Sequence, residues 1–226
     1  MTHTTSPVTL PKSFGQALPQ VFDRELDEKI ADRLVKLSAT CRRSAKCKRP
    51  AKCPKSAQCQ RSDNRQLQWH LREFILPGLA VYQVLRAEGC TQAAALAKVD
   101  EVLDLVTLPR RRQLERLGRF PLIYPLLRLY IRVALRQYPA PGWHIDWVEN
   151  SPAAIRFTMR SCFYFETLTR LGAPELTASF CRTDDVLYGH MSPAVAWQRT
   201  QTIGRGAASC DFCFARRSTT PELAAE

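Results

Sequence analysis

The hydrophobic pattern changes its period near residue 142, and this change limits the chain to folds that combine helices with strands. Before it, apolar side chains such as Leu71, Ile75 and Leu79 recur at the spacing of an amphipathic helix. After it, segments 143–148 and 154–159 alternate in the manner of strands. We therefore predict an α+β fold, in which a helical N-terminal half precedes a small, mostly antiparallel sheet with short helices.

Glycine, proline and capping residues set the expected element boundaries. Pro77-Gly78 predicts a kink, Gly89 the end of a helix, and Thr91 the N-cap of the next helix. The expected helices are 22–37, 66–88, 92–106, 110–117, 123–137, 163–171 and 175–181. The expected strands are 143–148, 154–159, 194–201 and 211–216.

Four segments are expected along the chain. Residues 1–20 are polar, contain three prolines and lack the apolar run of a secretory signal, so we expect a flexible tail of a cytoplasmic protein. Residues 21–64 combine a helix with a basic, cysteine-rich appendage. Residues 65–218 form the main α+β domain, and 219–226 form a second tail.

The cysteines and the charges reduce the number of function classes that fit the chain. Nine cysteines without a secretory signal favour reduced thiols, metal ligands or a nucleophile over a disulfide framework. The net charge is +12, and residues 41–62 hold eight Lys or Arg and no acidic residue, which allows contact with nucleic acid. The most apolar stretch, 120–138, carries arginines at positions 128, 132 and 136, so we predict an amphipathic helix and no membrane partner.

A series of short motifs occupies the C-terminal third. A cysteine, Cys162, precedes the aromatic run 163–165, and a Gly-Ala-Pro-Glu-Leu turn follows at 172–176. Phe180-Cys181-Arg182-Thr183-Asp184 comes next. The series closes with Arg199-Thr200-Gln201-Thr202-Ile203-Gly204-Arg205-Gly206 and Cys210-Asp211-Phe212-Cys213-Phe214.

In this order the motifs resemble the L-2-amino-thiazoline-4-carboxylic acid hydrolase family, strongly over 143–216 and more weakly over 67–142. The resemblance implies a hydrolase that acts on non-peptide C–N bonds and opens a cyclic isothiourea to a carbamoyl-cysteine. The ring carbon between nitrogen and sulfur must be attacked, the leaving sulfur must be protonated, and the substrate carboxylate needs a cationic or amide anchor. The expected partner is thus a small molecule.

The motif cysteines and aspartates supply the candidate catalytic residues, namely Cys181, Cys210, Cys162, Asp184 and Asp211. A thiolate is a strong nucleophile once its pKa is lowered, and a carboxylate can transfer the proton. The buried-thiol interpretation stays open for each cysteine, as does a version in which three thiolates hold zinc and activate a water. Cys213 is expected to pack in the core.

The closing turn supplies candidate substrate-binding residues. Arg199 could hold a carboxylate with two hydrogen bonds, and Gly204 and Gly206 would let backbone amides approach an anion. Thr202 belongs to the same turn, and His190 is a further acid–base candidate that falls at no motif position.

Four cysteines, Cys41, Cys47, Cys53 and Cys59, recur every six residues in the basic segment, and the resemblance does not explain them. They suggest thiolate ligands for zinc or an iron–sulfur cluster, although the gaps are wider than in common zinc sites. A flexible basic linker and a redox role are the alternatives. The alternative function for the chain is therefore a metal-stabilised basic protein that contacts nucleic acid through 41–61 and carries a hydrolase-like domain. The sequence does not indicate the oligomeric state.

Overall fold

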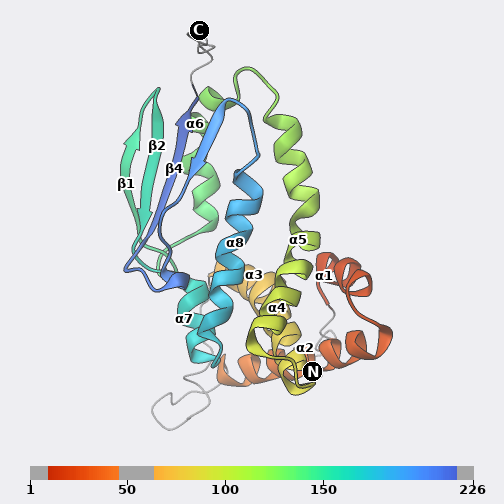
Figure 1. The fold of residues 1–226 in the computed structure, drawn as a ribbon. Helices are drawn as coiled ribbons and strands as arrows, with labels where there is room; N and C mark the ends of the chain where they lie inside the picture. The colour runs from red at the N-terminus through yellow and green to blue at the C-terminus, as the bar shows by residue number, and fades with distance from the viewer. Residues whose placement is uncertain (1–9, 46–63, 218–226) are drawn as a thin grey trace, which may run out of the picture. The chain divides into compact units, whose positions relative to one another are not determined.

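The computed structural model describes residues 10–45 and 64–217 (Figure 1). The chain divides into two compact units, and each is discontinuous in sequence. Of the described residues, the first unit holds 10–45, 64–106 and 163–180, and the second holds 107–162 and 181–217. The expected single domain over 65–218 thus corresponds to parts of both units, with boundaries inside two helices.

The first unit is helical. Its elements are α1 (Lys12–Ala17), η1 (Leu18–Gln20), α2 (Arg24–Ala45), α3 (Arg65–His70), the π-helical turn η3 (Leu71–Ile75), α4 (Leu76–Ala87), the first part of α5 (Gln92–Leu117), α7 (Phe163–Arg170), η5 (Pro174–Leu176) and the start of α8 (Thr177–Tyr188). Side chains such as Ile30, Leu79 and Leu168 are fully buried and form its core, which gives the unit its main stabilisation.

Two expectations for the N-terminal region are corrected. Residues 12–20 form α1 and η1 instead of a flexible tail, because Phe14, Ala17 and Leu18 are each only 1% exposed and anchor the segment. The following helix runs to Ala45, beyond the expected end at residue 37. It packs on α4, where Lys29 Nζ lies 2.9 Å from Glu88 Oε1 and Arg33 Nε donates to Gln83 Oε1 at 2.8 Å. Most of the expected cysteine-rich appendage lies outside the described residues.

The expected helix 66–88 is interrupted at a different place from the one predicted. The π-helical turn at 71–75 ends just before Leu76-Pro77, and Pro77 has no N–H to donate to that preceding turn. Gly78 is buried against Phe180, whose ring lies 2.7 Å from the position that a Cβ would occupy. Gly78 therefore provides close packing rather than a break.

Helix α5 is longer than expected. Thr91 caps it, as predicted, by accepting a hydrogen bond from Ala94 N at 3.2 Å. The helix then continues through Pro109 to Leu117, so that the two predicted helices, 92–106 and 110–117, are one. The proline removes one backbone donor, and the remaining turns on both sides keep the helix continuous.

The second unit contains the sheet. Strands β1 (Ile145–Asn150), β2 (Ala154–Met159), β3 (Val195–Gln198) and β4 (Cys210–Arg216) lie in the order β1-β2-β4-β3, and every pair is antiparallel. Phe157 opposes Phe212 in the register, and their rings stack at 4.8 Å. The α+β prediction is confirmed, including the antiparallel sheet.

Helices complete the second unit. They are the C-terminal part of α5, α6 (Ile123–Ala134), η4 (Leu135–Gln137), the turn η6 (Ile203–Arg205) and the remainder of α8. Tyr124 and Arg128 of α6 contact the turn after β1, where Tyr124 Oη donates to Ser151 O at 3.1 Å and Arg128 donates to Asn150. Within residues 10–45 and 64–217, no helix combines the length and apolar character that a bilayer crossing requires.

Candidate active site

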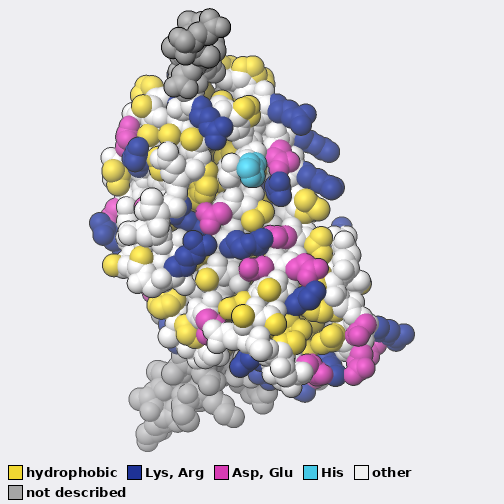
Figure 2. Space-filling view, viewed as in Figure 1, with side chains coloured by type: hydrophobic (Ala, Val, Ile, Leu, Met, Phe, Trp, Pro, Cys, Tyr) yellow, Lys and Arg dark blue, Asp and Glu magenta, His cyan; other side chains and the backbone are white. Residues whose placement is uncertain are grey.

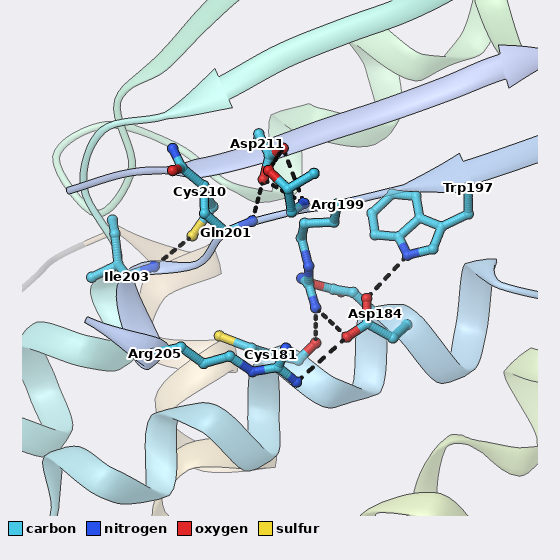
Figure 3. A network of polar contacts seen from close by, with 11 residues as sticks. Cys181, Asp184, Trp197, Arg199, Gln201, Ile203, Arg205, Cys210 and Asp211 are labelled. Carbon is cyan, nitrogen blue, oxygen red and sulfur yellow. Dashed lines mark hydrogen bonds and ion pairs between the residues drawn. The ribbon is translucent and has the colours of Figure 1, made fainter. Parts of the chain in front are cut away.

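Helix α8 brings two motif residues onto one side of the second unit. It continues to Tyr188, beyond the expected end at Cys181, because no glycine or proline interrupts it before Gly189. Cys181 and Asp184 are therefore three residues apart on one helix and share a face. Figure 3 shows both beside the segment that follows β3 and the beginning of β4.

Arg199 connects this segment to α8. Its side chain is only 2% exposed, and it donates through Nη1 to Asp184 Oδ2 at 2.9 Å. Its Nη2 donates to Asp185 Oδ2 at 2.7 Å and to the Cys181 carbonyl oxygen at 2.6 Å. Burial opposes the charge of the guanidinium, yet the two carboxylates raise the pKa of Arg199. Arg199 is thus a fixed cation that holds the 199–206 segment on α8.

Asp185 is a member of the network that the sequence interpretation passed over. Besides Arg199, it accepts a hydrogen bond from Trp197 Nε1 at 3.0 Å, and Arg205 Nη2 approaches it at 4.0 Å. The side chain of Arg205 is 61% exposed. The sequence signal for such a network was an acidic pair, Asp184-Asp185, followed by two arginines, Arg199 and Arg205.

The turn after Arg199 presents successive backbone amides to two thiols. Ile203 N donates to Cys210 Sγ at 3.2 Å, and the Gly204 amide lowers the pKa of Cys181 by hydrogen bonding to its sulfur. Figure 3 shows both sulfur atoms on the side of the network that carries Ile203. Cys181 and Cys210 thus share one small amide-lined region.

Burial keeps both thiols protonated at neutral pH. It raises the pKa of Cys210 to about 11, against the opposing hydrogen bond from Ile203. It also raises the pKa of Cys181, while the nearby Thr202 hydroxyl and Gly204 amide lower it in part. Cys181 is half-buried, whereas Cys210 is 5% exposed. A reaction that needs a thiolate therefore requires a base.

Asp184 has the properties of such a base. Burial raises its pKa to about 6, with a contribution from neighbouring Asp185, and Arg199 opposes the shift. The Asp184 side chain as a whole is 28% exposed. It is therefore mostly ionised at neutral pH and able to accept a proton.

Thr202 places a hydroxyl group beside Cys181. The residue is 1% exposed. Its hydroxyl lies near enough to the Cys181 thiol to lower the pKa of that thiol, but within the described part of the chain it forms no hydrogen bond of full geometry. A buried hydroxyl with such incomplete hydrogen bonding is a candidate contact for a bound molecule.

Asp211 has a different position from that of Asp184. Its carboxylate accepts hydrogen bonds from Thr200 N at 3.0 Å, Thr200 Oγ1 at 2.8 Å and Gln201 N at 2.7 Å. Partial burial opposes ionisation, but these hydrogen bonds lower the pKa of Asp211. The structure thus places Asp211 as an ionised clamp on the segment that leads to Thr202.

The two candidate glycines lie in the same turn. Gly206 has a φ of +92°, which a residue with a side chain rarely adopts, and Gly206 N donates to Ile203 O at 3.0 Å. Ala207 N closes the turn on Thr202 O at 3.1 Å. These bonds fix the direction of the Ile203 and Gly204 amides.

The remaining candidates take no part in the contacts described above. Cys162 is a half-buried cysteine between β2 and α7. His190 is exposed just after α8. Cys213 is 7% exposed and opposes Arg156 in the sheet. Cys213 thus packs in the core, as expected, whereas the proposed roles of Cys162 and His190 stay predictions.

The cysteine array falls mostly outside the described residues, which exclude Cys47, Cys53 and Cys59. Cys41 lies in α2 and is disulfide-bonded. Within residues 10–45 and 64–217, no group of three or more His, Cys, Asp or Glu could hold a metal ion. A disulfide-bonded Cys41 offers no thiolate, so metal binding by all four cysteines would first require its reduction. Zinc or iron–sulfur binding by the array, and its contact with nucleic acid, stay predictions.

Comparison with known proteins bears on the region that contains this network. The family described as L-2-amino-thiazoline-4-carboxylic acid hydrolase matches residues 70–214 of the 226-residue chain. That range contains every member of the network, from Cys181 to Asp211. No curated protein and no solved structure matches the chain significantly.

Proposed function

Because the chain belongs to the L-2-amino-thiazoline-4-carboxylic acid hydrolase family, we propose that it opens the ring of that substrate, or of a close cyclic analogue, by cysteine-dependent hydrolysis. The observation that carries the proposal is the pair of thiols, Cys181 and Cys210, which meet successive amides of one turn beside Asp184. A thiol, a base and amide donors are the groups that such a reaction needs.

Cys181 is the nucleophile in this proposal. It is half-buried, so a substrate can reach it, and it lies one helical turn from Asp184. Cys210 is less suitable, because it is 5% exposed, already accepts the Ile203 N–H, and has a pKa of about 11. We assign Cys210 to positioning of the turn.

Asp184 moves the proton. Its ionised carboxylate accepts the proton of Cys181, and the Cys181 sulfur bonds to the ring carbon that lies between nitrogen and sulfur. The bond from that carbon to the ring sulfur then breaks, and the leaving sulfur takes the proton from Asp184. Arg199 occupies Asp184 Oδ2, so the transfer uses the other oxygen.

Water completes the reaction. It adds to the same carbon and the bond to Cys181 breaks. One proton of the water passes through Asp184 to the released thiolate, and the other goes to the former ring nitrogen. The water oxygen becomes the carbamoyl oxygen, so the product is a carbamoyl-cysteine. The Gly204 amide and the Thr202 hydroxyl lie beside the Cys181 sulfur, where they can stabilise charge that develops during both additions.

Arg205 is the carboxylate anchor in this proposal. The sequence suggested Arg199, but Arg199 is 2% exposed and both of its Nη atoms are engaged. Arg205 is 61% exposed and contacts Asp185 only at 4.0 Å. A guanidinium with free donors is the better partner for a substrate carboxylate.

The test is to detect carbamoyl-cysteine by mass spectrometry after the purified full chain is mixed with L-2-amino-thiazoline-4-carboxylate. The descarboxy ring, 2-amino-thiazoline, serves as the matched substrate, and its product, carbamoyl-cysteamine, is detected in the same way. Product above a heat-denatured control, with lower kcat/KM for the descarboxy ring, supports the substrate assignment. Folded protein that turns over neither compound would contradict it.

A further inference from the structure

Exposed hydrophobic side chains concentrate on one helix of the second unit. Six of the ten large hydrophobic side chains that are exposed among the described residues lie between positions 120 and 133. We call this set the α6 face, and its members are Phe120, Leu122, Leu126, Leu129, Tyr130 and Val133. Single exposed hydrophobic residues are ordinary, whereas a contiguous set marks a surface that binds something apolar.

Helical geometry makes the set continuous. Leu122, Leu126, Leu129 and Val133 recur every three or four residues, so they form one stripe along α6. Leu129 is 79% exposed. The opposite side of the helix is already covered, because Tyr124 is 3% and Ile131 is 6% exposed. Helix α6 is therefore apolar on two sides, and packing within the unit accounts for only one of them.

Arginines border the α6 face. Arg132 lies over the Trp147 ring at 4.4 Å, beside the stripe, and Arg128 donates to Asn150. Residues 110–136 contain eight arginines and a single acidic residue, Glu115. Figure 2 shows a row of Lys and Arg side chains over the C-terminal half of α5. Arg128 and Arg132 thus give the apolar stripe a cationic edge along α6, in a part of the chain that is basic as a whole.

We propose that the α6 face docks on the surface of an anionic phospholipid bilayer. Apolar side chains of such a face enter the boundary between headgroups and acyl chains, and the arginines pair with lipid phosphates. A second copy of the chain fits less well, since two such faces would bring their arginine borders together. The association is peripheral, because no helix in the described ranges could cross the bilayer. It revises the expectation, drawn from sequence, of no membrane partner.

The experiment is co-sedimentation of the full chain with vesicles of phosphatidylcholine alone and with vesicles that contain about one third phosphatidylglycerol. We expect binding to the anionic vesicles that weakens as salt increases, and little binding to the neutral ones. The double variant Leu126→Ser and Leu129→Ser should bind the anionic vesicles at least about tenfold more weakly. The matched control is Val35→Ser, which changes an exposed hydrophobic residue of α2 and should bind like the wild type.

Far-UV circular dichroism and turnover establish that the double variant is folded, since neither leucine belongs to the proposed catalytic network. Three results would overturn the proposal. The first is the absence of vesicle binding, and the second is equal binding by the wild type and the double variant, which would point to the basic segment 41–62 instead. The third is a dimer, seen by light scattering, that the double variant converts to monomer without any vesicle binding.

Discussion

Arg199 and Asp184 form an ion pair of 2.9 Å in which the arginine is almost fully buried and the carboxyl group is partly exposed. The arginine comes from the segment after β3, and the aspartate comes from α8. The pair therefore fixes the turn that carries Thr202 and Gly204 against the helix that carries Cys181. This positioning, and not a direct role in substrate binding, is the function that we assign to Arg199.

Replacing Arg199 should destabilise the protein. Arg199→Met removes the buried guanidinium that pairs with Asp184 and Asp185. The carboxylates then stay partly buried without this positive partner, so the free energy of unfolding should decrease by about 3 kcal/mol. Arg160→Met removes an ion pair with Asp146 whose arginine is 59% exposed, so urea denaturation should detect little change. Equal effects of the two substitutions would argue against a structural role for Arg199.

Thr202→Val should separate stability from activity. It removes a buried hydroxyl whose described interaction, with the Cys181 thiol, falls short of a full hydrogen bond, so the free energy of unfolding should change little. Loss of a donor near the reacting atoms should lower kcat roughly 100-fold. Thr202→Ser keeps the hydroxyl and should retain most of the activity. If the valine variant turns over at the wild-type rate, Thr202 has no catalytic contact.

The pH dependence of kcat/KM should reflect the ionisation of the Asp184 carboxyl group. Because burial raises its pKa to about 6 and the base must be ionised, kcat/KM should increase with pH through about 6 and then level off. The surface variant Asp146→Asn should show the same midpoint. A profile that decreases through this range would mean that Asp184 acts in its protonated form.

The raised pKa of Asp184 also makes the free energy of unfolding depend on pH. The folded pKa of Asp184, about 6, lies above its ordinary value of 3.8. Between these two values the folded protein binds more protons at Asp184 than the unfolded chain does. The contribution of Asp184 to the free energy of unfolding is therefore present below pH 4 and is lost as the pH rises to about 6.

Gly118 allows a close approach between two segments of the second unit. A Cβ at this position would lie 1.6 Å from the Met191 carbonyl oxygen, and Ser192 Oγ donates to the Gly118 carbonyl oxygen at 2.7 Å. Gly118→Ala should therefore lower the free energy of unfolding by about 2 kcal/mol. A Cβ on Gly15 would meet no atom within 4 Å, so Gly15→Ala in α1 should be neutral or slightly stabilising. Thermal unfolding that ranks the two variants in the opposite order would contradict this account.

The fold class and many boundaries could be predicted because they depend on local signals. Strand β2 matches the expected range 154–159, and Gly89 and Gly172 have the positive φ of helix ends. The first two helices, α1 and η1, were not predicted, since prolines near Phe14 and Leu18 suggested disorder although these side chains are buried. Burial of that kind depends on distant partners, which periodicity does not reveal.

The sequence motifs named candidate site residues, which stay predictions, but they did not give the contacts among them. The motifs selected Cys181, Asp184, Arg199 and Thr202, and the structure brings these four together. The engaged state of Arg199 and the clamp formed by Asp211 depend on contacts between segments far apart in the chain. The local sequence pattern does not show which hydrogen-bond donors are used in such long-range contacts.

The most direct test of cysteine-dependent catalysis compares carbamoyl-cysteine formation by the wild type, Cys181→Ala and Cys213→Ala. Cys213 is 7% exposed in β4, so it is a matched buried thiol outside the proposed machinery. We predict that the folded Cys181→Ala variant forms no product above background, whereas Cys213→Ala keeps wild-type turnover per folded molecule. Full turnover by Cys181→Ala would contradict the thiol mechanism.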